Sequence, residues 1–329
     1  MSNKEKKNRL NTFWKVVIIL LLILILIVGG TFLFLNSKLN KMEKVNLDEN
    51  ELDVSADIDK NLSDYRNIAI FGIDSREDSY NKGNRSDGII IASINNKTKD
   101  VNLVSVYRDT YVDIEGHGLD KITHAYSYGE APLAIKTLNK NLDLNIKDFI
   151  TVNFDAVKEI VDYIGGVSMT ITSEEVSHIP GISKAGTYNL TGDQALAYAR
   201  IRYAEGGDYK RTERMRDVLT AVVNKLKTMD ISQINKFIDV ALPKIRTNIS
   251  SSEIFSFIPS AKSLKITKSI GWPYETKGIT KDRWYGVPIT LESNVTKLHQ
   301  EMFGEEDYMP SQTVKEISNK IVTNTGYSK

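Results

Sequence analysis

The hydrophobic positions of this chain follow two different patterns. Residues 16–35 form an apolar run of twenty residues without a single charge. From about residue 67 onward, short apolar runs alternate with segments whose apolar residues recur every three or four positions. A helix of twenty residues is about 30 Å long, which matches the hydrocarbon core of a bilayer. The first pattern therefore predicts a transmembrane helix, and the second predicts a folded domain of strands and helices.

The residues that flank the apolar run predict its orientation. Five basic residues and one acidic residue occur in residues 1–15, whereas acidic residues gather between Asp48 and Asp53. Positive charge is retained on the cytoplasmic side of a membrane. A cleaved signal peptide is the alternative, but its apolar region is usually shorter and no small-x-small cleavage site follows here. We therefore expect a basic cytoplasmic tail (1–15), an uncleaved signal anchor (16–35) that crosses the cell membrane once, and an extracellular remainder.

The exported part is expected to be one α/β domain at residues 67–304. Strands are predicted at 67–74, 88–95, 101–108, 149–154 and 167–172, and again within 263–290. Helices are predicted at 122–142, 155–165 and 210–228, after a capping box at Thr191–Gln194, twice within 231–262, and at 293–303. Such alternation indicates a central sheet with helices on both faces. Residues 36–66 are predicted to be a polar linker, and residues 305–329 a polar tail with one short helix.

Composition excludes several classes of function. The chain has 43 basic and 42 acidic residues, and the basic excess lies in the first fifteen positions, so the exported domain is mildly acidic. A nucleic-acid partner is therefore not expected. The chain has no cysteine, which excludes disulfides, thiolate zinc sites and a catalytic thiol. Its four histidines show no metal-ligand spacing, so a zinc hydrolase is not expected either.

Charged residues stand at the ends of several predicted strands. Asp74 follows the first strand, Arg85 and Asp87 precede the second, and Arg108 and Asp109 end the third. Open α/β sheets bind ligands at such strand ends. A fourth charged segment contains Arg200, Arg202, Asp208, Arg211 and Arg214. Arginine binds phosphate oxygens in a bidentate manner, and Mg²⁺ takes one or two carboxylates together with phosphate oxygens and water. Together the segments predict a site for a pyrophosphate and Mg²⁺, with Mn²⁺ as a possible substitute; structural Arg–Asp bridges are the alternative.

The helix predicted at 210–228 places two of these arginines on its apolar side. Its stripe runs through Met215, Val218, Leu219, Val222 and Leu226, in steps of three and four. Arg211 and Arg214 each stand four residues before a member of that stripe, so both should face inward and bind an anion at the helix N-terminus. Arg216 lies off the stripe and is expected to be solvated.

These segments, in this order, resemble the LytR-CpsA-Psr family of bacterial cell-wall enzymes. The resemblance covers roughly residues 67–230, and its stretches are GIDSR, NRSDGIIIASIN, VSVYRDTYVDI, KITHAYSYG, VNFDAVKEIVDYIGGV, LTGDQALAYARIRY and GGDYKRTERMRDVL. It implies a membrane-anchored transferase of a Gram-positive type of bacterium. Such an enzyme moves a phosphate-linked glycopolymer, such as teichoic acid or capsule, from an undecaprenyl-pyrophosphate carrier to peptidoglycan.

The resemblance also implies a role for each site residue. Asp74 and Asp87 would hold Mg²⁺, while Arg85, Arg108, Arg200, Arg202 and Arg211 would bind pyrophosphate oxygens. Asp109 and Asp208 would orient those arginines or assist the acceptor, and the lipid would lie in an apolar tunnel. Position 215 is often glutamine in this family and is methionine here. A lipid-pyrophosphate hydrolase and a non-enzymatic, lipid-binding regulator remain alternatives. Trp272 and Trp284 could stack on sugars or belong to the core.

Overall fold

The computed structural model describes residues 43–74, 83–202 and 207–328, together one compact unit of the chain. The predicted membrane anchor and cytoplasmic tail lie outside these ranges. Within the described ranges, no helix combines the length and the apolar character needed to cross a bilayer.

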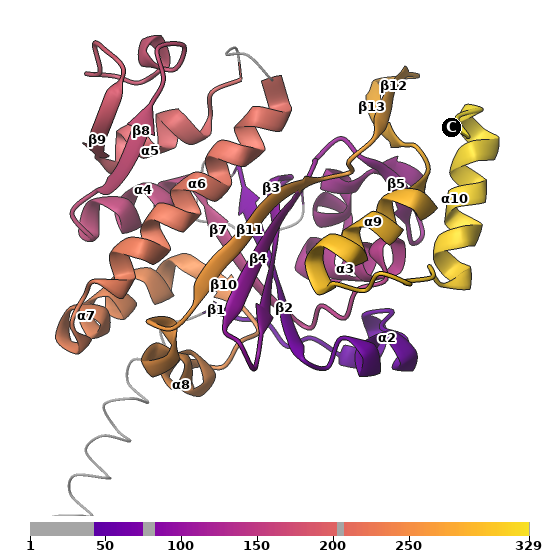
Figure 1. The fold of residues 1–329 in the computed structure, drawn as a ribbon, viewed down its shortest axis with the longest axis horizontal. Helices are drawn as coiled ribbons and strands as arrows, with labels where there is room; N and C mark the ends of the chain where they lie inside the picture. The colour runs from indigo at the N-terminus through magenta and orange to yellow at the C-terminus, as the bar shows by residue number, and fades with distance from the viewer. Residues whose placement is uncertain (1–42, 75–82, 203–206, 329) are drawn as a thin grey trace, which may run out of the picture. The chain divides into compact units, whose positions relative to one another are not determined.

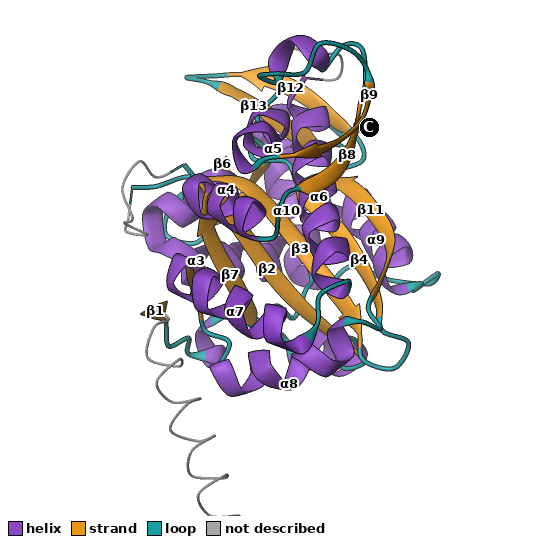
Figure 2. Ribbon diagram, turned by 90° about the vertical axis from the view of Figure 1, so that its left-hand side faces the viewer, coloured by secondary structure: helices purple, strands orange, loops and turns teal. Residues whose placement is uncertain are grey.

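A seven-stranded mixed sheet forms the centre of the unit (Figures 1 and 2). Its strand order is β1-β10-β7-β2-β3-β4-β11. The strands are β1 (Glu43–Lys44), β2 (Tyr65–Ile73), β3 (Ser86–Asn95), β4 (Asp100–Val106), β7 (Asp148–Asn153), β10 (Ile245–Thr247) and β11 (Lys265–Trp272). Strands β2 and β7 are parallel, as are β4 and β11, whereas β3 is antiparallel to both β2 and β4. The C-terminal ends of β2, β4, β7 and β11 and the N-terminal end of β3 therefore lie along the same border of the sheet, which we call the sheet edge.

Helices cover both faces of the sheet, which confirms the predicted α/β fold class. On one face lie α3 (Ile122–Leu142), α9 (Leu291–Phe303) and α10 (Gln312–Thr325), with α2 (Ala56–Asn61) nearby. On the other lie α4 (Phe154–Tyr163), α5 (Gly192–Ala199), α6 (Gly207–Lys227), α7 (Ile231–Ala241) and α8 (Ser251–Ala261). Strand β3 is buried on both faces because helices lie above and below it, so its sequence reads as a continuous apolar run.

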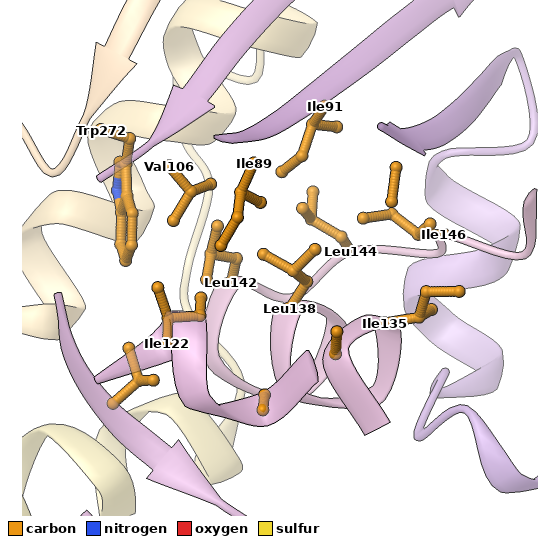
Figure 3. Close-up of a cluster of buried hydrophobic side chains, with 14 of the residues drawn as sticks. Ile89, Ile91, Val106, Ile122, Ile135, Leu138, Leu142, Leu144, Ile146 and Trp272 are labelled. Carbon is orange, nitrogen blue, oxygen red and sulfur yellow. The ribbon is translucent and has the colours of Figure 1, made fainter. Parts of the chain in front are cut away.

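The larger core lies between the sheet and α3. Figure 3 shows Ile89, Val106 and Trp272 facing Ile122 and Leu138 of that helix. The opposite face of the same strands carries a smaller apolar cluster, which α6 covers through Met215 and Leu219. We call this second set the α6-side cluster; its buried members are Ile90, Ala92, Ile94, Val101 and Leu103.

Three hairpins and three short helices complete the described unit. The hairpins are β5 (Tyr111–Ile114) with β6 (Gly118–Lys121), β8 (Val167–Ile171) with β9 (Gly186–Leu190), and β12 (Thr276–Thr280) with β13 (Trp284–Pro288). The short helices are η1 (Glu49–Glu51), η2 (Val176–His178) and η3 (Leu242–Lys244). Hairpin β12–β13 continues the chain beyond the end of β11 (Figure 1).

Both flanks of the predicted domain pack more closely than a linker and a tail would. Leu52, Ile58 and Leu62, from the range predicted to be a linker, are buried in the larger core. In the range predicted to be a tail, helix α10 buries Val314, Ile317 and Ile321 in the same core. The reason is that a narrow apolar stripe is enough to dock a short helix, even where most of its residues are polar.

Candidate active site

Three of the predicted site residues meet at the sheet edge described above. Asp74 follows β2, Asp87 is the second residue of β3, and Arg108 stands two residues after β4. Since Ile73 pairs with Ser86 in the sheet register, the end of β2 and the start of β3 are direct neighbours. The alternating strand directions thus bring together side chains that are separated by up to 34 positions in the sequence.

A cavity of about 200 Å³ opens beside this edge, under the N-terminal part of α6. Its lining residues come from β3, α4, α6 and the segments directly after β2 and α5: Asp74, Asp87, Phe154, Arg200, Arg202, Arg211 and Met215. Three guanidinium groups and two carboxylates thus share one small volume. The cavity has the positive excess that an anionic ligand requires.

Asp87 organises the arginines around this cavity. Its Oδ1 accepts a hydrogen bond of 2.7 Å from Arg108 Nη1, and its Oδ2 lies 3.6 Å from Arg202 Nη2. Arg211 Nη2 donates to the backbone carbonyl of Asp87 at 3.3 Å. The side chain of Asp87 is only 12% exposed, so these charge-assisted contacts are poorly screened by solvent.

The outer side of the cavity is more exposed. Arg200 Nη2 lies 3.4 Å from Asp74 Oδ1, and about half of each side chain is exposed. The Arg200 guanidinium also sits 4.3 Å from the centre of the Phe154 ring, a cation–π contact that fixes its direction. Phe154 directly follows β7, whose end pairs with the end of β2, so the sheet positions the ring that Arg200 contacts.

Asp109 is held by a lysine that the sequence analysis did not single out. Lys121 Nζ lies 2.6 Å from Asp109 Oδ1, and Arg108 Nε lies 3.6 Å from Asp109 Oδ2. Asp87 and Asp109 thus lie near different nitrogens of the Arg108 guanidinium, Nη1 and Nε. Lys121 lies at the end of β6, and hairpin β5–β6 brings it back to Asp109.

Two further predicted residues, Arg85 and Asp208, are not part of the contacts that the structure describes. Arg85 is exposed just before β3 and does not line the cavity. Asp208 belongs to the first turn of α6, but its side chain lies outside the described residues.

Arg214 faces a different part of the molecule. Its Nε donates to Glu175 Oε1 at 2.7 Å and its Nη1 to the carbonyl of Ile201 at 3.2 Å, and both charged side chains are buried. Burial opposes ionisation of Glu175, but the amide of Thr172 and the Arg214 guanidinium lower its pKa below the usual value. The geometry therefore points to a structural ion pair that ties the segment before η2 to α6, and not to a phosphate ligand.

The expectation that Arg216 is solvated is wrong. The residue is 4% exposed, and its Nε donates to Ser269 Oγ at 2.8 Å. Burial lowers the pKa of this arginine. The physical reason is that α6 contacts the sheet on one side and β8 and α5 on another, so more than one stripe of this helix is covered.

Glycines allow α6 to approach the sheet edge closely. A Cβ atom at Gly88 would lie 3.1 Å from Met215 Sδ, and Gly72 faces Gly88 across the two strands. Met215 consequently lines the charged cavity while it also packs against the α6-side cluster. The same side chain therefore joins the polar and the apolar part of this region.

The cavity residues are compatible with a divalent cation of the hard type. Asp74 and Asp87 offer carboxylate oxygens to one volume, which suits Mg²⁺ when phosphate oxygens and water complete its coordination. Among the described residues there is no group of three or more histidine, aspartate or glutamate side chains that could hold a metal ion by themselves. A cation at this place would therefore depend on the ligand for most of its coordination.

Comparison with known proteins gives consistent matches. The model of the LytR_cpsA_psr family matches residues 30–300. The chain is 32% identical over 296 residues to the polyisoprenyl-teichoic acid–peptidoglycan teichoic acid transferase TagT of Bacillus subtilis (strain 168), and the match covers 84% of this chain and 91% of that protein. Its fold is similar to that of TagT bound to LI-WTA, with a TM-score of 0.58, 25% identity, and coverage of 81% of this chain and 92% of that chain. It is also similar to the LytR-CPS2A-psr family protein YwtF (TagT) with bound octaprenyl pyrophosphate lipid, with a TM-score of 0.54, 23% identity and the same coverage.

Proposed function

Because the chain belongs to the LytR_cpsA_psr family, we propose that it transfers a phosphate-linked glycopolymer of the teichoic acid type from a polyprenyl-pyrophosphate carrier to peptidoglycan. The TagT relative carries both the donor polymer and the acceptor in its name. A structure of similar fold holds octaprenyl pyrophosphate. These names support the substrate class.

The observation that carries the proposal is the position of Met215 between two environments. On one side of it lies the cavity with three arginines, and on the other lies the apolar α6-side cluster. A polyprenyl pyrophosphate has the same division, with a doubly phosphorylated head and a hydrocarbon tail. The head would occupy the cavity, and the tail would leave it past the thioether of Met215.

The proposed reaction is a phosphoryl transfer. An acceptor hydroxyl oxygen forms a bond to the phosphorus that carries the glycopolymer, the bond from that phosphorus to the bridging oxygen breaks, and polyprenyl monophosphate leaves while the hydroxyl proton is released. In such reactions the protein mainly positions the groups and neutralises developing charge. Arg108, fixed between Asp87 and Asp109, is suited to the transferring phosphate. Arg200, Arg202 and Arg211 are suited to the leaving phosphate. Asp74 and Asp87 would hold Mg²⁺, which neutralises phosphate oxygens when bound.

The test compares Arg108→Ala with Arg66→Ala. The two arginines have the same residue type and the same side-chain exposure of 20%, and each pairs with an aspartate. Arg66, however, lies near the start of β2, at the opposite end of the sheet from the cavity. Loss of a preorganised contact to the transition state commonly lowers the rate by about 10²–10³-fold, so Arg108→Ala should lose most transfer. Arg66→Ala should keep the wild-type rate, although its melting temperature should fall.

The same assay separates the alternatives. Polymer attached to peptidoglycan identifies a transferase, whereas polymer phosphate released at an equal rate without peptidoglycan identifies a hydrolase. A wild-type rate in the Arg108→Ala variant would contradict the site assignment. Binding of lipid without turnover in the wild-type protein would leave the regulator as the remaining function.

A further inference from the structure

The two tryptophans of the described chain lie in opposite environments. Trp272, at the end of β11, is fully buried, and its Nε1 donates to the carbonyl of Asn294 at 3.1 Å. Trp284, at the start of β13, is 46% exposed. Tryptophan is enriched at interfaces because its ring is large and apolar while its N–H is polar. Trp284 presents part of such a ring to solvent, whereas Trp272 does not.

The indole of Trp284 lies flat on its own hairpin. Gly278 and Gly286 form a directly opposed pair in β12–β13, and Trp284 stands two residues before Gly286, on the same face. A Cβ atom at Gly278 would lie 2.6 Å from Nε1 of the indole, and one at Gly286 would lie 3.3 Å from its Cη2. One ring face thus rests on two residues without side chains. The other face of the hairpin packs into the core through Tyr285 and Val287.

An aromatic row connects this platform to the site. Next to the glycine pair on the same face is Thr276, whose Oγ1 lies 3.0 Å from the hydroxyl of Tyr209. The Tyr209 ring contacts Tyr107 edge to face, with 4.5 Å between the ring centres. Tyr107 immediately precedes Arg108. The backbone also connects the hairpin to the site, because Gly286 N–H donates to the carbonyl of Asp109 at 2.9 Å.

The platform and the charged cavity occupy different ends of the sheet edge. The cavity residues Phe154, Asp74 and Asp87 follow or begin β7, β2 and β3, whereas Arg108 follows β4, and β12–β13 follows the neighbouring strand β11. Along this edge, Arg108 therefore stands between the cavity and the hairpin. A group that is transferred at Arg108 would meet a carrier from one side and an acceptor from the other.

We infer that Trp284 is a stacking platform for one pyranose ring of the acceptor glycan strand, an assignment that rests on the proposed function. The C–H groups on the apolar face of a β-linked, gluco-configured pyranose carry partial positive charge, and the π face of an indole is negative. Such a ring stacks on a flat, uncharged aromatic surface, whereas the anionic phosphates of the donor suit the arginines. Trp284, Tyr209 and Tyr107 define the path of the acceptor toward Arg108.

The experiment uses the full-length chain in detergent micelles and four variants. Trp284→Ala removes the ring, and Trp284→Phe retains an aromatic face. Gly278→Ala leaves the tryptophan in the sequence but forces its indole off the hairpin, since the added Cβ would lie 2.6 Å from Nε1. Tyr163→Ala is the control, because Tyr163 is similarly exposed, at 40%, but lies at the end of α4. Transfer rates are measured against glycan-strand concentration at saturating donor, and against donor concentration at saturating glycan strands. Chitohexaose binding is measured by calorimetry.

Trp284→Ala and Gly278→Ala should raise the half-saturating concentration of glycan strands about three- to tenfold, the range expected for loss of one aromatic stacking contact. Chitohexaose affinity should fall by the same factor, while the half-saturating donor concentration and the maximal rate stay at wild-type values. Trp284→Phe should retain most of the affinity, and Tyr163→Ala all of it. A rise in the half-saturating donor concentration, or wild-type acceptor values in both Trp284→Ala and Gly278→Ala, would overturn the inference while leaving the transferase intact. Chitohexaose binding that depends on Trp284 in a protein without transfer would support the platform and reject the proposed function.

Discussion

Asp87 contacts two arginine side chains, one on each carboxylate oxygen, and its carbonyl accepts a hydrogen bond from a third. Replacement of this residue would disturb the whole cluster, so it is a poor probe of metal binding. Asp74 is more useful, because it lines the same cavity while more than half of its side chain is exposed.

We expect chelation by EDTA to stop transfer, and Mg²⁺ or Mn²⁺ to restore it. Asp74→Asn should raise the Mg²⁺ concentration for half-maximal transfer about tenfold, which corresponds to a loss of about 1.4 kcal/mol of binding free energy. Asp64→Asn is the matched control, because Asp64 is similarly exposed and pairs with Lys97 away from the cavity. A metal titration of the transfer rate measures both, and full activity after exhaustive chelation would remove the metal from the mechanism.

The burial of Arg216 leads to a prediction about the stability of the fold. Its guanidinium is buried but has only hydroxyl and carbonyl partners at hydrogen-bond distance among the described residues, Ser269 and Thr212. Arg216→Ala should lower the free energy of unfolding by about 1–3 kcal/mol, because a cavity forms and those partners lose their donor. Arg216→Met fills the space without burying a charge, so it should be neutral or stabilising.

Urea denaturation measures these differences, with Lys210→Ala as the control on the same helix. Lys210 is half exposed, and its loss should change stability by no more than about 0.5 kcal/mol. If Arg216→Ala were equally silent, the burial of Arg216 would have to be abandoned.

At the scale of elements, α10 shows how a polar segment joins the core. Ile321 is 1% exposed and packs with the larger core, whereas Thr323 of the same helix is exposed. We expect Ile321→Ala to lower the free energy of unfolding by about 2–4 kcal/mol, as large-to-small changes in cores do. Thr323→Ala should be close to neutral. Denaturant titration of both variants tests the packing, and an unchanged midpoint for Ile321→Ala would indicate a tail that does not dock.

Much of this architecture can be predicted from local patterns, because each pattern has a local cause. The strands at 67–74, 88–95 and 101–108 and the helix at 122–142 agree with β2, β3, β4 and α3 to within about two residues. The capping box at Thr191–Gln194 is confirmed at the start of α5. The juxtaposition of Asp74, Asp87 and Arg108 follows in the same way from alternating strand directions.

The direction of each arginine on α6 could not be predicted in this way. Helical periodicity places Arg211 and Arg214 on one stripe, but it does not tell which neighbour each part of the stripe will meet. Arg211 donates to the backbone carbonyl of Asp87 at the sheet edge, while Arg214 pairs with Glu175, which lies 39 positions earlier in the sequence. Phe154 could have been found, since it follows a strand predicted to lie in the same sheet. Lys121 could not, because its position depends on how β5–β6 folds back.

At the scale of the whole molecule, we expect the N-terminus in the cytoplasm and residues 36–329 outside the cell. The basic tail and the apolar run at 16–35 are the basis for this expectation. Protease added to intact, wall-stripped cells should degrade the domain and leave a cytoplasmic marker protein untouched. A domain that survives while the cells remain intact, but is degraded after lysis, would place it on the inner side of the membrane.

The pairing of charges in the cavity has a consequence for how a ligand is captured. Asp74 and Asp87 already neutralise part of the arginines' charge, and salt screens the remaining positive charge beyond a Debye length of about 8 Å. Long-range steering of dissolved anions is correspondingly weak. A phosphate group therefore interacts with the arginines mainly at short range. Such a site favours a lipid-linked phosphate over dissolved inorganic phosphate. Inorganic phosphate is attracted only weakly from a distance, whereas a head group that its lipid tail already holds beside the site needs no long-range attraction.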